Sequence, residues 1–207
     1  YRFASFGDQA IDRHVLWRHD VDASVHRAAR LAEIEAEAGV RATYFLNPRS
    51  DLYSLAEPTV ADKVRLIAEA GHDIGLHFDA TVSRNSTWAH ASLETSVNAE
   101  RKLLETLVGK PIAAVSWHNP EQSNLLEFGA EKIAGLVNAY SERLRQSYVY
   151  ASDSNGYWRF KPMPNVIVEG HERLHLLTHP EWWTPSPMHA PQRLDRARMG
   201  RLLANLR

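Results

Sequence analysis

Short apolar runs alternate along the chain with longer stretches in which apolar residues recur about every 3.6 positions. The short runs are typical of buried strands, whereas the longer stretches are typical of amphipathic helices. Strands are expected at Val15–Asp22, Ala42–Leu46, Asp73–Asp79, Ile112–His118, Leu136–Tyr140, Tyr148–Ala151, Val166–Val168 and Leu174–Thr178. Because strands and helical stretches alternate, the pattern predicts βαβ units that build a parallel sheet or barrel.

The ends of the expected helices carry signals of their own. Ser24 is a favourable N-cap, and Gly39 a favourable stop, for the helix that follows the first strand. Further helices are expected at about Thr59–Ala70, within about Ser86–Val108, and in a basic tail from Pro191 onward. The segment between about residues 122 and 164 has the least distinct pattern.

Composition narrows the classes of protein that the chain can represent. Its 207 residues suit a single α/β domain over residues 1–207, and the 44% hydrophobic and 24% charged fractions are ordinary for a globular protein. The formal net charge of -1, from 24 Lys and Arg against 25 Asp and Glu, does not favour a nucleic-acid partner. The absence of Cys excludes disulfides, thiolate metal sites and Cys nucleophiles.

Membrane insertion is not expected, because no apolar run approaches the roughly 20 residues that span a bilayer. No signal peptide is visible, so a cytoplasmic location is the expectation. The sequence starts at Tyr1 without a Met, which is compatible with a leader that has been removed.

Polar residues collect on one face of several expected strands, toward the carboxyl end of each. Side chains alternate between the two faces of a strand, so Arg18, Asp20 and Asp22 share one face of the first strand. In the third strand His77 and Asp79 likewise share a face. An apolar face is explained by helices that pack outside a sheet, but a charged face needs another reason.

Two later strands carry the same kind of residue at their ends. His118 closes the fourth strand, and His175 and His179 share a face of the last one. In β/α barrels the carboxyl ends of the strands form the face where ligands bind. A buried carboxylate is costly unless it is paired or bound to a metal. The combined pattern therefore predicts a cation at a common mouth.

Each of these residues also has a purely structural interpretation. Asp20 and Asp22 can cap the next helix or pair with Arg18, and His77 can be a hydrogen-bonded core histidine. His118 can be a turn residue, because an Asn-Pro pair follows it. Their joint occurrence at successive strand ends favours the functional interpretation.

The motifs at these strand ends resemble the polysaccharide deacetylase, or NodB-homology, superfamily. They occur in the order typical of that family and span about residues 15 to 183. The resemblance rests on Arg18-His19-Asp20-Val21-Asp22, Ala42-Thr43-Tyr44-Phe45, Gly71-His72-Asp73-Ile74-Gly75-Leu76-His77, Ser116-Trp117-His118-Asn119-Pro120 and Leu176-Leu177-Thr178-His179-Pro180. It implies an α/β fold that forms a distorted, incomplete (β/α)7 barrel.

The resemblance also implies roles for individual residues. Asp20 would act as the catalytic base, and Asp22 and His77 would bind a divalent metal, commonly zinc. His179 matches the late histidine that serves as general acid. Asp153 lies where the family often places a residue that orients this histidine.

The chain departs from the family pattern at the metal site. The family usually places a second histidine four residues after the first, where this chain has Thr81, and the usual Arg-Pro motif on a following strand is missing. We expect His118 to supply the missing imidazole from the neighbouring strand, with Asp79 as the alternative ligand. If neither residue binds a metal, the protein is a metal-free pseudoenzyme.

The mechanism implied is hydrolysis of an acyl group, acetyl or formyl, from the nitrogen of an amino sugar in a surface polysaccharide or its precursor. One divalent metal, with Zn2+ expected, would leave a coordination position open for water. Arg18 would keep Asp20 ionised and oriented. Trp158, Trp182 and Trp183 are candidates for stacking on the carbohydrate substrate, although packing in the core or rim is an equal alternative.

Two other functions fit parts of this pattern. A non-catalytic carbohydrate-binding or assembly module with a degenerate deacetylase fold would explain the missing second histidine. A hydrolase of another bond, such as a cyclic amide or a phosphoester, would also use a metal. Phosphoester hydrolysis usually needs two metals or a basic clamp, and the near-neutral charge does not indicate one.

Overall fold

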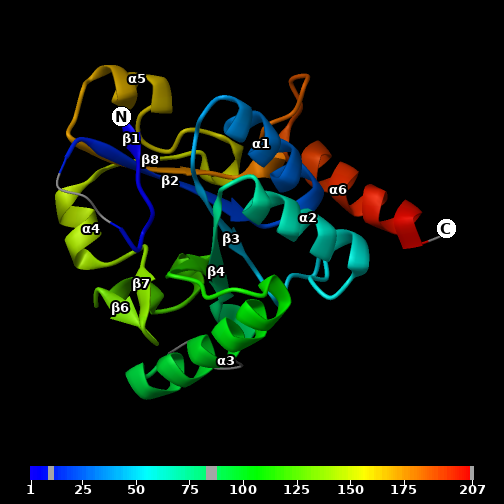
Figure 1. The fold of residues 1–207 in the computed structure, drawn as a ribbon, viewed down its shortest axis with the longest axis horizontal. Coiled ribbons are helices and arrows are strands. Elements are labelled where there is room, and N and C mark those ends of the chain that lie inside the picture. The colour runs from blue at the N-terminus through cyan, green and yellow to red at the C-terminus, as the bar shows by residue number, and fades with distance from the viewer. Residues whose placement is uncertain (9–11, 83–87, 206–207) are drawn as a thin grey trace.

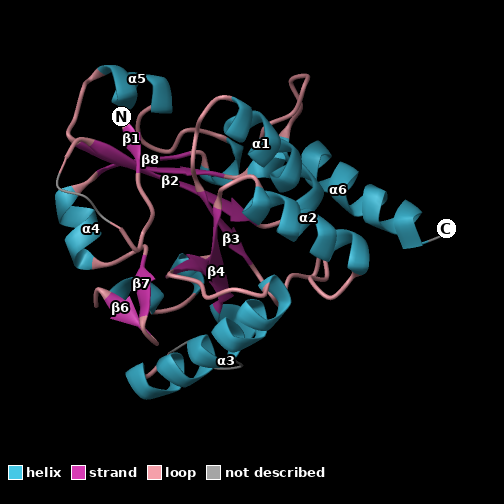
Figure 2. Ribbon diagram, in the orientation of Figure 1, coloured by secondary structure: helices cyan, strands magenta, loops and turns pink. Residues whose placement is uncertain are grey.

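The computed structural model describes residues 1–8, 12–82 and 88–205, and within them the strands join into one curled sheet (Figures 1 and 2). The order along the sheet is β6-β7-β5-β4-β3-β2-β9-β8, with β1 paired to β2 at the side. All the pairings between neighbouring strands are parallel except the β6–β7 hairpin. The path from β7 to β8 therefore contains seven parallel strands in the described chain, and it confirms the distorted, incomplete (β/α)7 barrel.

The elements alternate as the apolar pattern predicts. The strands are β1 (Arg2–Phe3), β2 (His14–Val21), β3 (Thr43–Leu46), β4 (Asp73–Asp79), β5 (Ala114–His118), β6 (Lys132–Ile133), β7 (Leu136–Asn138), β8 (Val149–Ser152) and β9 (Arg173–Thr178). The helices are α1 (Val25–Glu37), α2 (Pro58–Glu69), α3 (His90–Val108), α4 (Glu142–Ser147), α5 (Met163–Val168) and α6 (Ala190–Asn205). Short 3-10 turns are η1 (Ala80–Val82), η2 (Pro120–Gln122), η3 (Leu125–Glu127), η4 (Ser154–Gly156) and η5 (Pro180–Trp182).

Local signals explain where the long helices begin and end. The Ser24 side chain accepts a hydrogen bond from the Arg27 N–H and caps α1. Gly109 ends α3 with φ at 75°, a left-handed conformation that glycine adopts without steric cost. The part of the expected third helix at residues 86 and 87 lies outside the described residues.

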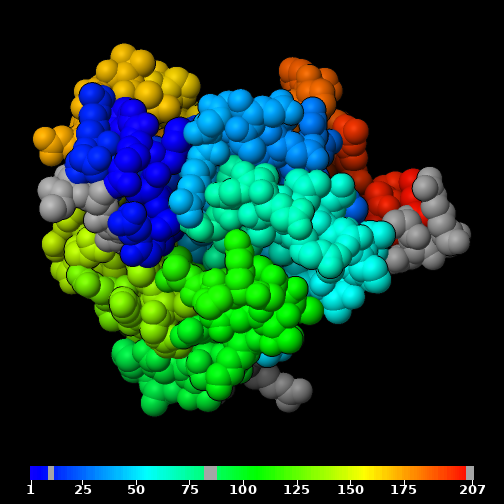
Figure 3. Space-filling model, viewed as in Figure 1, coloured from blue at the N-terminus to red at the C-terminus, as the bar shows by residue number. Residues whose placement is uncertain are grey.

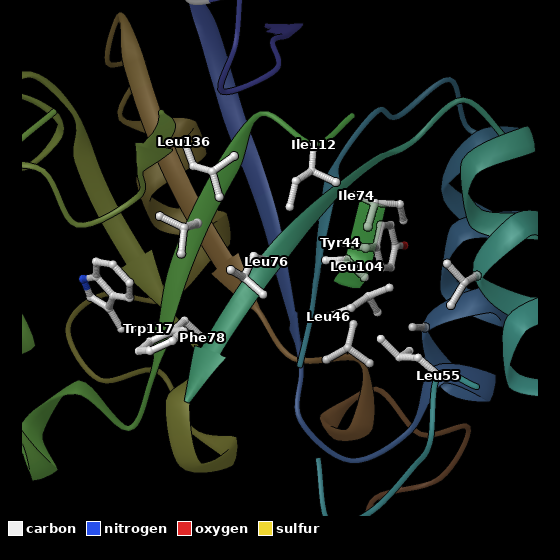
Figure 4. Packing of buried hydrophobic residues seen from close by; sticks show 14 of the residues in the cluster. Tyr44, Leu46, Leu55, Ile74, Leu76, Phe78, Leu104, Ile112, Trp117 and Leu136 are labelled. Carbon is white, nitrogen blue, oxygen red and sulfur yellow. The ribbon is translucent and has the colours of Figure 1, made fainter. Parts of the chain in front are cut away.

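The outer face of the sheet packs against α1, α2 and α3 and forms the main hydrophobic core (Figure 4). Alternate residues of the strands supply it, and Ile74, Leu76 and Phe78 of β4 show the expected two-residue period. Leu104 of α3 reaches the same core from the helix layer. The apolar face of the strands is thereby buried against the helices on the outside of the barrel.

The opposite face of the strands points into the barrel. Leu16 and Phe45 close its lower end in a separate apolar cluster, and Arg18 and Asp20 lie further along the same face of β2. Gly75 makes room here, because a Cβ atom at this position would lie 2.6 Å from the Phe45 ring. The barrel interior is thus apolar at its base and polar toward the carboxyl ends of the strands.

One expected strand is wrong. Val166–Val168 belongs to the short helix α5, not to a strand. Pro162 and Pro164 stand at the start of this helix, where a missing N–H costs nothing, and they favour a helix N-terminus over a sheet position. Three β-branched residues are too few to outweigh that signal.

None of the described helices combines the length and the apolar character that a membrane-spanning helix needs.

Candidate metal centre and active site

Three side chains meet at the carboxyl ends of β2, β4 and β5. The Asp22 Oδ1 atom lies 3.0 Å from His77 Nε2 and 3.2 Å from His118 Nδ1, and the two ring nitrogens lie 3.2 Å apart. The parallel register of β4 and β5 places Asp79 beside His118 and His77 beside Ser116. The two imidazoles therefore come from neighbouring strands, offset by two residues along the ladder.

This group fits a divalent metal ion. Atoms that bind one tetrahedral zinc at about 2.0–2.1 Å are separated by about 3.3 Å from one another. The three ligand atoms here are separated by 3.0 to 3.2 Å. Two imidazoles and one carboxylate also match the donor set of catalytic zinc sites, which leave a fourth position open. Asp22, His77 and His118 could therefore hold a metal together.

The metal group is supported by hydrogen bonds behind it. The Nδ1 atom of His77 lies 2.6 Å from Ser116 Oγ, which in turn donates to Asp20 Oδ1 at 3.4 Å. This series of hydrogen bonds places a proton on Nδ1 of His77. It leaves the Nε2 lone pair of the same ring directed at Asp22 and His118. Asn119 contacts the other ring, with its amide nitrogen 2.9 Å from His118 Nε2.

Asp20 lies behind the metal group in a buried ion pair. Arg18 Nε donates to Asp20 Oδ1 at 2.8 Å, and Arg18 Nη2 donates to Oδ2 at 2.6 Å. Burial by itself would raise the pKa of Asp20, but the charge of Arg18 outweighs it and lowers the pKa to about 2. Asp20 is therefore an ionised carboxylate that can accept a proton.

His179 faces the metal group from the other side of the barrel mouth. It directly follows β9, and its Nε2 atom lies 4.0 Å from Asp22 Oδ2. Its Nδ1 atom lies 2.7 Å from Asp153 Oδ1, and Asp153 Oδ2 accepts a hydrogen bond from Trp183 Nε1 at 3.2 Å. Burial lowers the pKa of His179, but the hydrogen bond to Asp153 and the charge of Asp22 outweigh it and raise the pKa to about 9.

Solved structures share this arrangement of strands and helices. A family 4 carbohydrate esterase (CE4) pseudoenzyme from Bacillus anthracis matches 94% of this chain with a TM-score of 0.55 at 14% identity. The chain spans 62% of that pseudoenzyme's length. A family 4 acetyl xylan esterase from Clostridium thermocellum, solved with a cobalt ion, matches 92% of this chain and 84% of its own, with a TM-score of 0.53 at 16% identity.

A third match is the catalytic domain of a peptidoglycan N-acetylglucosamine deacetylase from Eubacterium rectale. It covers 96% of this chain and 89% of its own, with a TM-score of 0.50 at 13% identity. The chain has the CE4 fold. No protein-family model and no curated protein matches the sequence. The resemblance read from the strand-end motifs is therefore confirmed at the level of the fold.

Asp79, the alternative ligand, lies outside the metal group on this CE4 fold. Its Oδ1 atom accepts hydrogen bonds from the backbone and side chain of Thr81 at 2.9 and 2.7 Å. Thr81 lies in η1, and its hydroxyl donates to Asp79 and takes no part in the metal group. Of the described residues, His118 is the one that joins Asp22 and His77.

A cleft of about 590 Å3 opens beside the metal group. Among the three tryptophans considered for sugar binding, Trp182 lines this cleft. Trp183 contacts Asp153 with its indole nitrogen, and its ring lies in a separate apolar groove with Trp17. Trp158 packs against the outer cluster around Met163 and does not line the cleft.

Tyr140, Tyr150 and Glu181 lie close to the site without a distinct signal in the sequence, whereas strand alternation placed His175 on the face of His179. Tyr140 accepts a hydrogen bond from Arg18 Nη2 at 3.0 Å, and Tyr150 lines the cleft. His175 lies on the cleft floor, where burial and Arg18 lower its pKa to about 3. Glu181 is 3% exposed, and neither of its carboxylate oxygens has a partner among the described residues. Long-range packing brings the two tyrosines and Glu181 to the site, and the alternation of apolar residues does not report such packing.

Proposed function

We propose that this protein is a metal-dependent hydrolase that removes an N-acyl group, acetyl or formyl, from an amino sugar of a surface polysaccharide or its precursor. The observation that carries the proposal is the meeting of three distinct groups at one barrel mouth. These are a possible metal group with ligand atoms 3.0 to 3.2 Å apart, an ionised carboxylate, and a histidine held by a carboxylate. The CE4 fold supports the proposal, because the acetyl xylan esterase and the peptidoglycan deacetylase share it.

Asp22, His77 and His118 would hold the metal, for which Zn2+ is the best candidate by donor set. A divalent ion there would supply Lewis-acid polarisation of the acyl carbonyl. The Ser116 hydroxyl links His77 to Asp20 and holds both in one arrangement. The fixed side chains thus position the ligands before any substrate enters.

Asp20 would take the proton of the attacking water. It is 2% exposed and already ionised, so it accepts a proton without first losing one. Arg18 holds both of its oxygens, and the rings of Phe45 and Tyr140 lie near the guanidinium, with centroids 5.4 and 4.7 Å from its Cζ atom. Arg18 therefore orients Asp20 and keeps it charged.

His179 would donate a proton to the leaving amine. Its Nε2 atom points toward Asp22, whereas Nδ1 is occupied by Asp153, so one ring nitrogen is free to act toward the cleft. An imidazolium at this place has a proton to give, and proton donation to the amine nitrogen makes it a better leaving group. Asp153 orients the ring in the same way that a carboxylate orients a catalytic histidine in other hydrolases.

The second candidate is a carbohydrate-binding module without chemistry, and the likeness to a CE4 pseudoenzyme favours it. An acyl-release assay separates the two. Metal-loaded protein is incubated with N-acetylated and N-formylated amino sugars, as monomers and as oligomers, and the released acetate or formate is measured. Release from at least one amino sugar is expected. Binding of these glycans without release, at full metal occupancy, would establish the module instead.

A further inference from the structure

A second concave site lies on the other side of η5 from the metal centre. It is a groove of about 520 Å3 between the start of α1, the start of α2 and one side of α6. Figure 3 shows α1 and α2 side by side, with α6 beyond them at the edge of the molecule. Glu181 lines this groove and Trp182 lines the metal cleft, so these adjacent residues of η5 form a shared wall.

The groove is strongly cationic although the whole chain is nearly neutral. Its described lining contains five arginines and two glutamates, and we call it the arginine groove. The arginines are Arg27, Arg30, Arg193, Arg196 and Arg201, and the glutamates are Glu57 and Glu181. Such a concentration of guanidinium groups in a concave surface favours an anionic ligand.

Two of the five arginines are already paired with carboxylates. Arg30 pairs with Glu33 at 2.8 Å, and Arg201 pairs with Glu57 at 3.2 Å. Arg27, Arg193 and Arg196 have no carboxylate partner among the described residues.

The surroundings of the arginines that lack a carboxylate partner favour a bound anion. Arg27 and Arg196 both line the groove, and burial and the like charge of Arg196 lower the pKa of Arg27. The Nε atom of Arg193 is buried and lacks a hydrogen-bond partner in the described chain. Like charges brought together in a concave site are relieved by a bound anion.

The groove also includes the N-terminal end of a long helix. Ser24, Val25 and His26, which are the cap and first two residues of α1, belong to its lining. The N–H groups and the positive dipole end of a helix bind phosphate well. This contribution has the same sign as that of the arginines.

Glu181 adds a different requirement. It is 3% exposed, lines the groove, and has no partner for either carboxylate oxygen among the described residues. A buried carboxylate calls for hydrogen-bond donors, and sugar hydroxyl groups are suitable ones. Burial and the charge of Asp22 raise the pKa of Glu181, so its carboxyl group can also donate a hydrogen bond to a sugar oxygen. The three arginines without a carboxylate partner then supply the positive charge for a phosphate monoester of about −1.5 to −2.

We propose that the arginine groove binds a phosphorylated sugar, with the phosphate among Arg27, Arg193 and Arg196 and a sugar hydroxyl on Glu181. Because the groove and the metal cleft share the wall formed by η5, one ligand can occupy both. The phosphorylated sugar in the groove would then be part of the same substrate molecule that enters the metal cleft. That extension rests on the proposed function, and it makes the substrate a phosphate-bearing amino sugar and not a finished neutral polymer.

Calorimetric titration of N-acetylglucosamine 1-phosphate into metal-loaded protein tests the proposal. The variant is Arg196→Gln, at an exposed position on α6, and the matched control is Arg198→Gln, an exposed arginine of the same helix outside the groove. Arg27→Gln is a second variant at the opposite wall. Wild type and Arg198→Gln should bind equally, and each groove variant about tenfold more weakly or worse. Thermal unfolding of all four proteins checks that they are folded.

Equal binding by Arg196→Gln, Arg27→Gln and wild type would overturn the proposal, because the phosphate would then be held elsewhere, for example at the metal. Equal weakening by Arg198→Gln would overturn it too, since only general charge attraction would remain. Titration of glucuronate, whose anion is a carboxylate, separates the sources of negative charge, and binding as tight as that of the sugar phosphate would refute phosphate selection. If N-acetylglucosamine 1-phosphate binds through the groove but releases no acetate, the proposal for the groove is retained. The deacetylase proposal is then contradicted.

Discussion

The two walls of the barrel mouth are built on different principles. On the metal wall, Asp22, His77 and His118 come from three strand ends, and both imidazoles approach the same carboxylate oxygen, at 3.0 and 3.2 Å. On the acid wall, Asp153 and His179 follow the neighbouring strands β8 and β9 and form one pair at 2.7 Å.

The difference concerns what each wall needs in order to be stable. The acid wall is complete, because an imidazolium and a carboxylate satisfy each other. The metal wall has two rings that compete for one oxygen, so a cation between them gives all three groups a partner. We therefore expect ion-dependent order on the metal wall and ion-independent order on the acid wall.

Asp20→Asn is expected to have the largest effect of the substitutions considered. It removes the proposed base behind the metal wall and keeps every proposed metal ligand. Turnover should fall about 10³-fold, in the range for loss of a general base. Metal content should stay at the wild-type value, and elemental analysis beside kinetics measures both. Loss of metal in this variant would make Asp20 a ligand and not the base.

Asp153→Asn tests the acid wall alone. The hydrogen bond to Asp153 and the charge of Asp22 raise the pKa of His179 to about 9 in the metal-free protein, against the opposing effect of burial. The variant should lower that pKa toward the ordinary value of about 6.5 and reduce turnover about 100-fold. Imidazole NMR signals followed with pH measure the shift. An unchanged pKa would show that Asp153 does not hold the proton.

The same pair makes a prediction about stability. Since the folded-state pKa of His179 lies above the unfolded value, the pair stabilises the fold fully below about pH 6.5, and this contribution is lost as the pH rises through about 9. Denaturant unfolding of metal-free wild type should therefore show a fall in the free energy of unfolding between these values. Asp153→Asn should show a smaller fall.

Ser116→Ala has the smallest expected effect. It tests whether the hydrogen bond to His77 contributes to metal binding. The hydroxyl joins His77 Nδ1 to Asp20, at 2.6 and 3.4 Å, and does not contact the metal position. Its loss should weaken zinc binding about tenfold, as is usual when the partner of a ligand histidine is removed. Competition with a chelating dye measures this affinity. Ser123→Ala, on the loop after η2, is a matched control that should have no effect.

Much of this site could be predicted from short-range pattern. Two-residue alternation in β2 and β4 separates Asp20 and His77 from their apolar neighbours, and the parallel sheet then brings the strand ends together. The choice of His118 over Asp79 also followed from the family's missing histidine, and the structure brings His118 into the group. Periodicity is a reliable guide here because one face of these strands is apolar and packs on the helices, whereas the other is polar toward the barrel mouth.

The remainder depends on contacts between distant segments. Trp158 was a candidate for sugar binding, but it packs against the cluster to which Met163 and Val166 of α5 belong. Tyr140 reaches Arg18 across 122 positions of sequence. Glu181 lies between a proline and two tryptophans, and its burial depends on the way η5 folds against α1 and α6. Local propensity carries no information on such contacts.

Zinc titration of the metal-free protein tests the central claim most directly. Wild type, His118→Ala and Asp79→Ala are compared by calorimetry, and the last two remove neighbours in the β4–β5 ladder. We predict one equivalent of zinc for wild type and for Asp79→Ala, and binding weakened about 100-fold or more for His118→Ala. Unchanged binding by His118→Ala, with loss in Asp79→Ala, would contradict a metal centre formed by Asp22, His77 and His118.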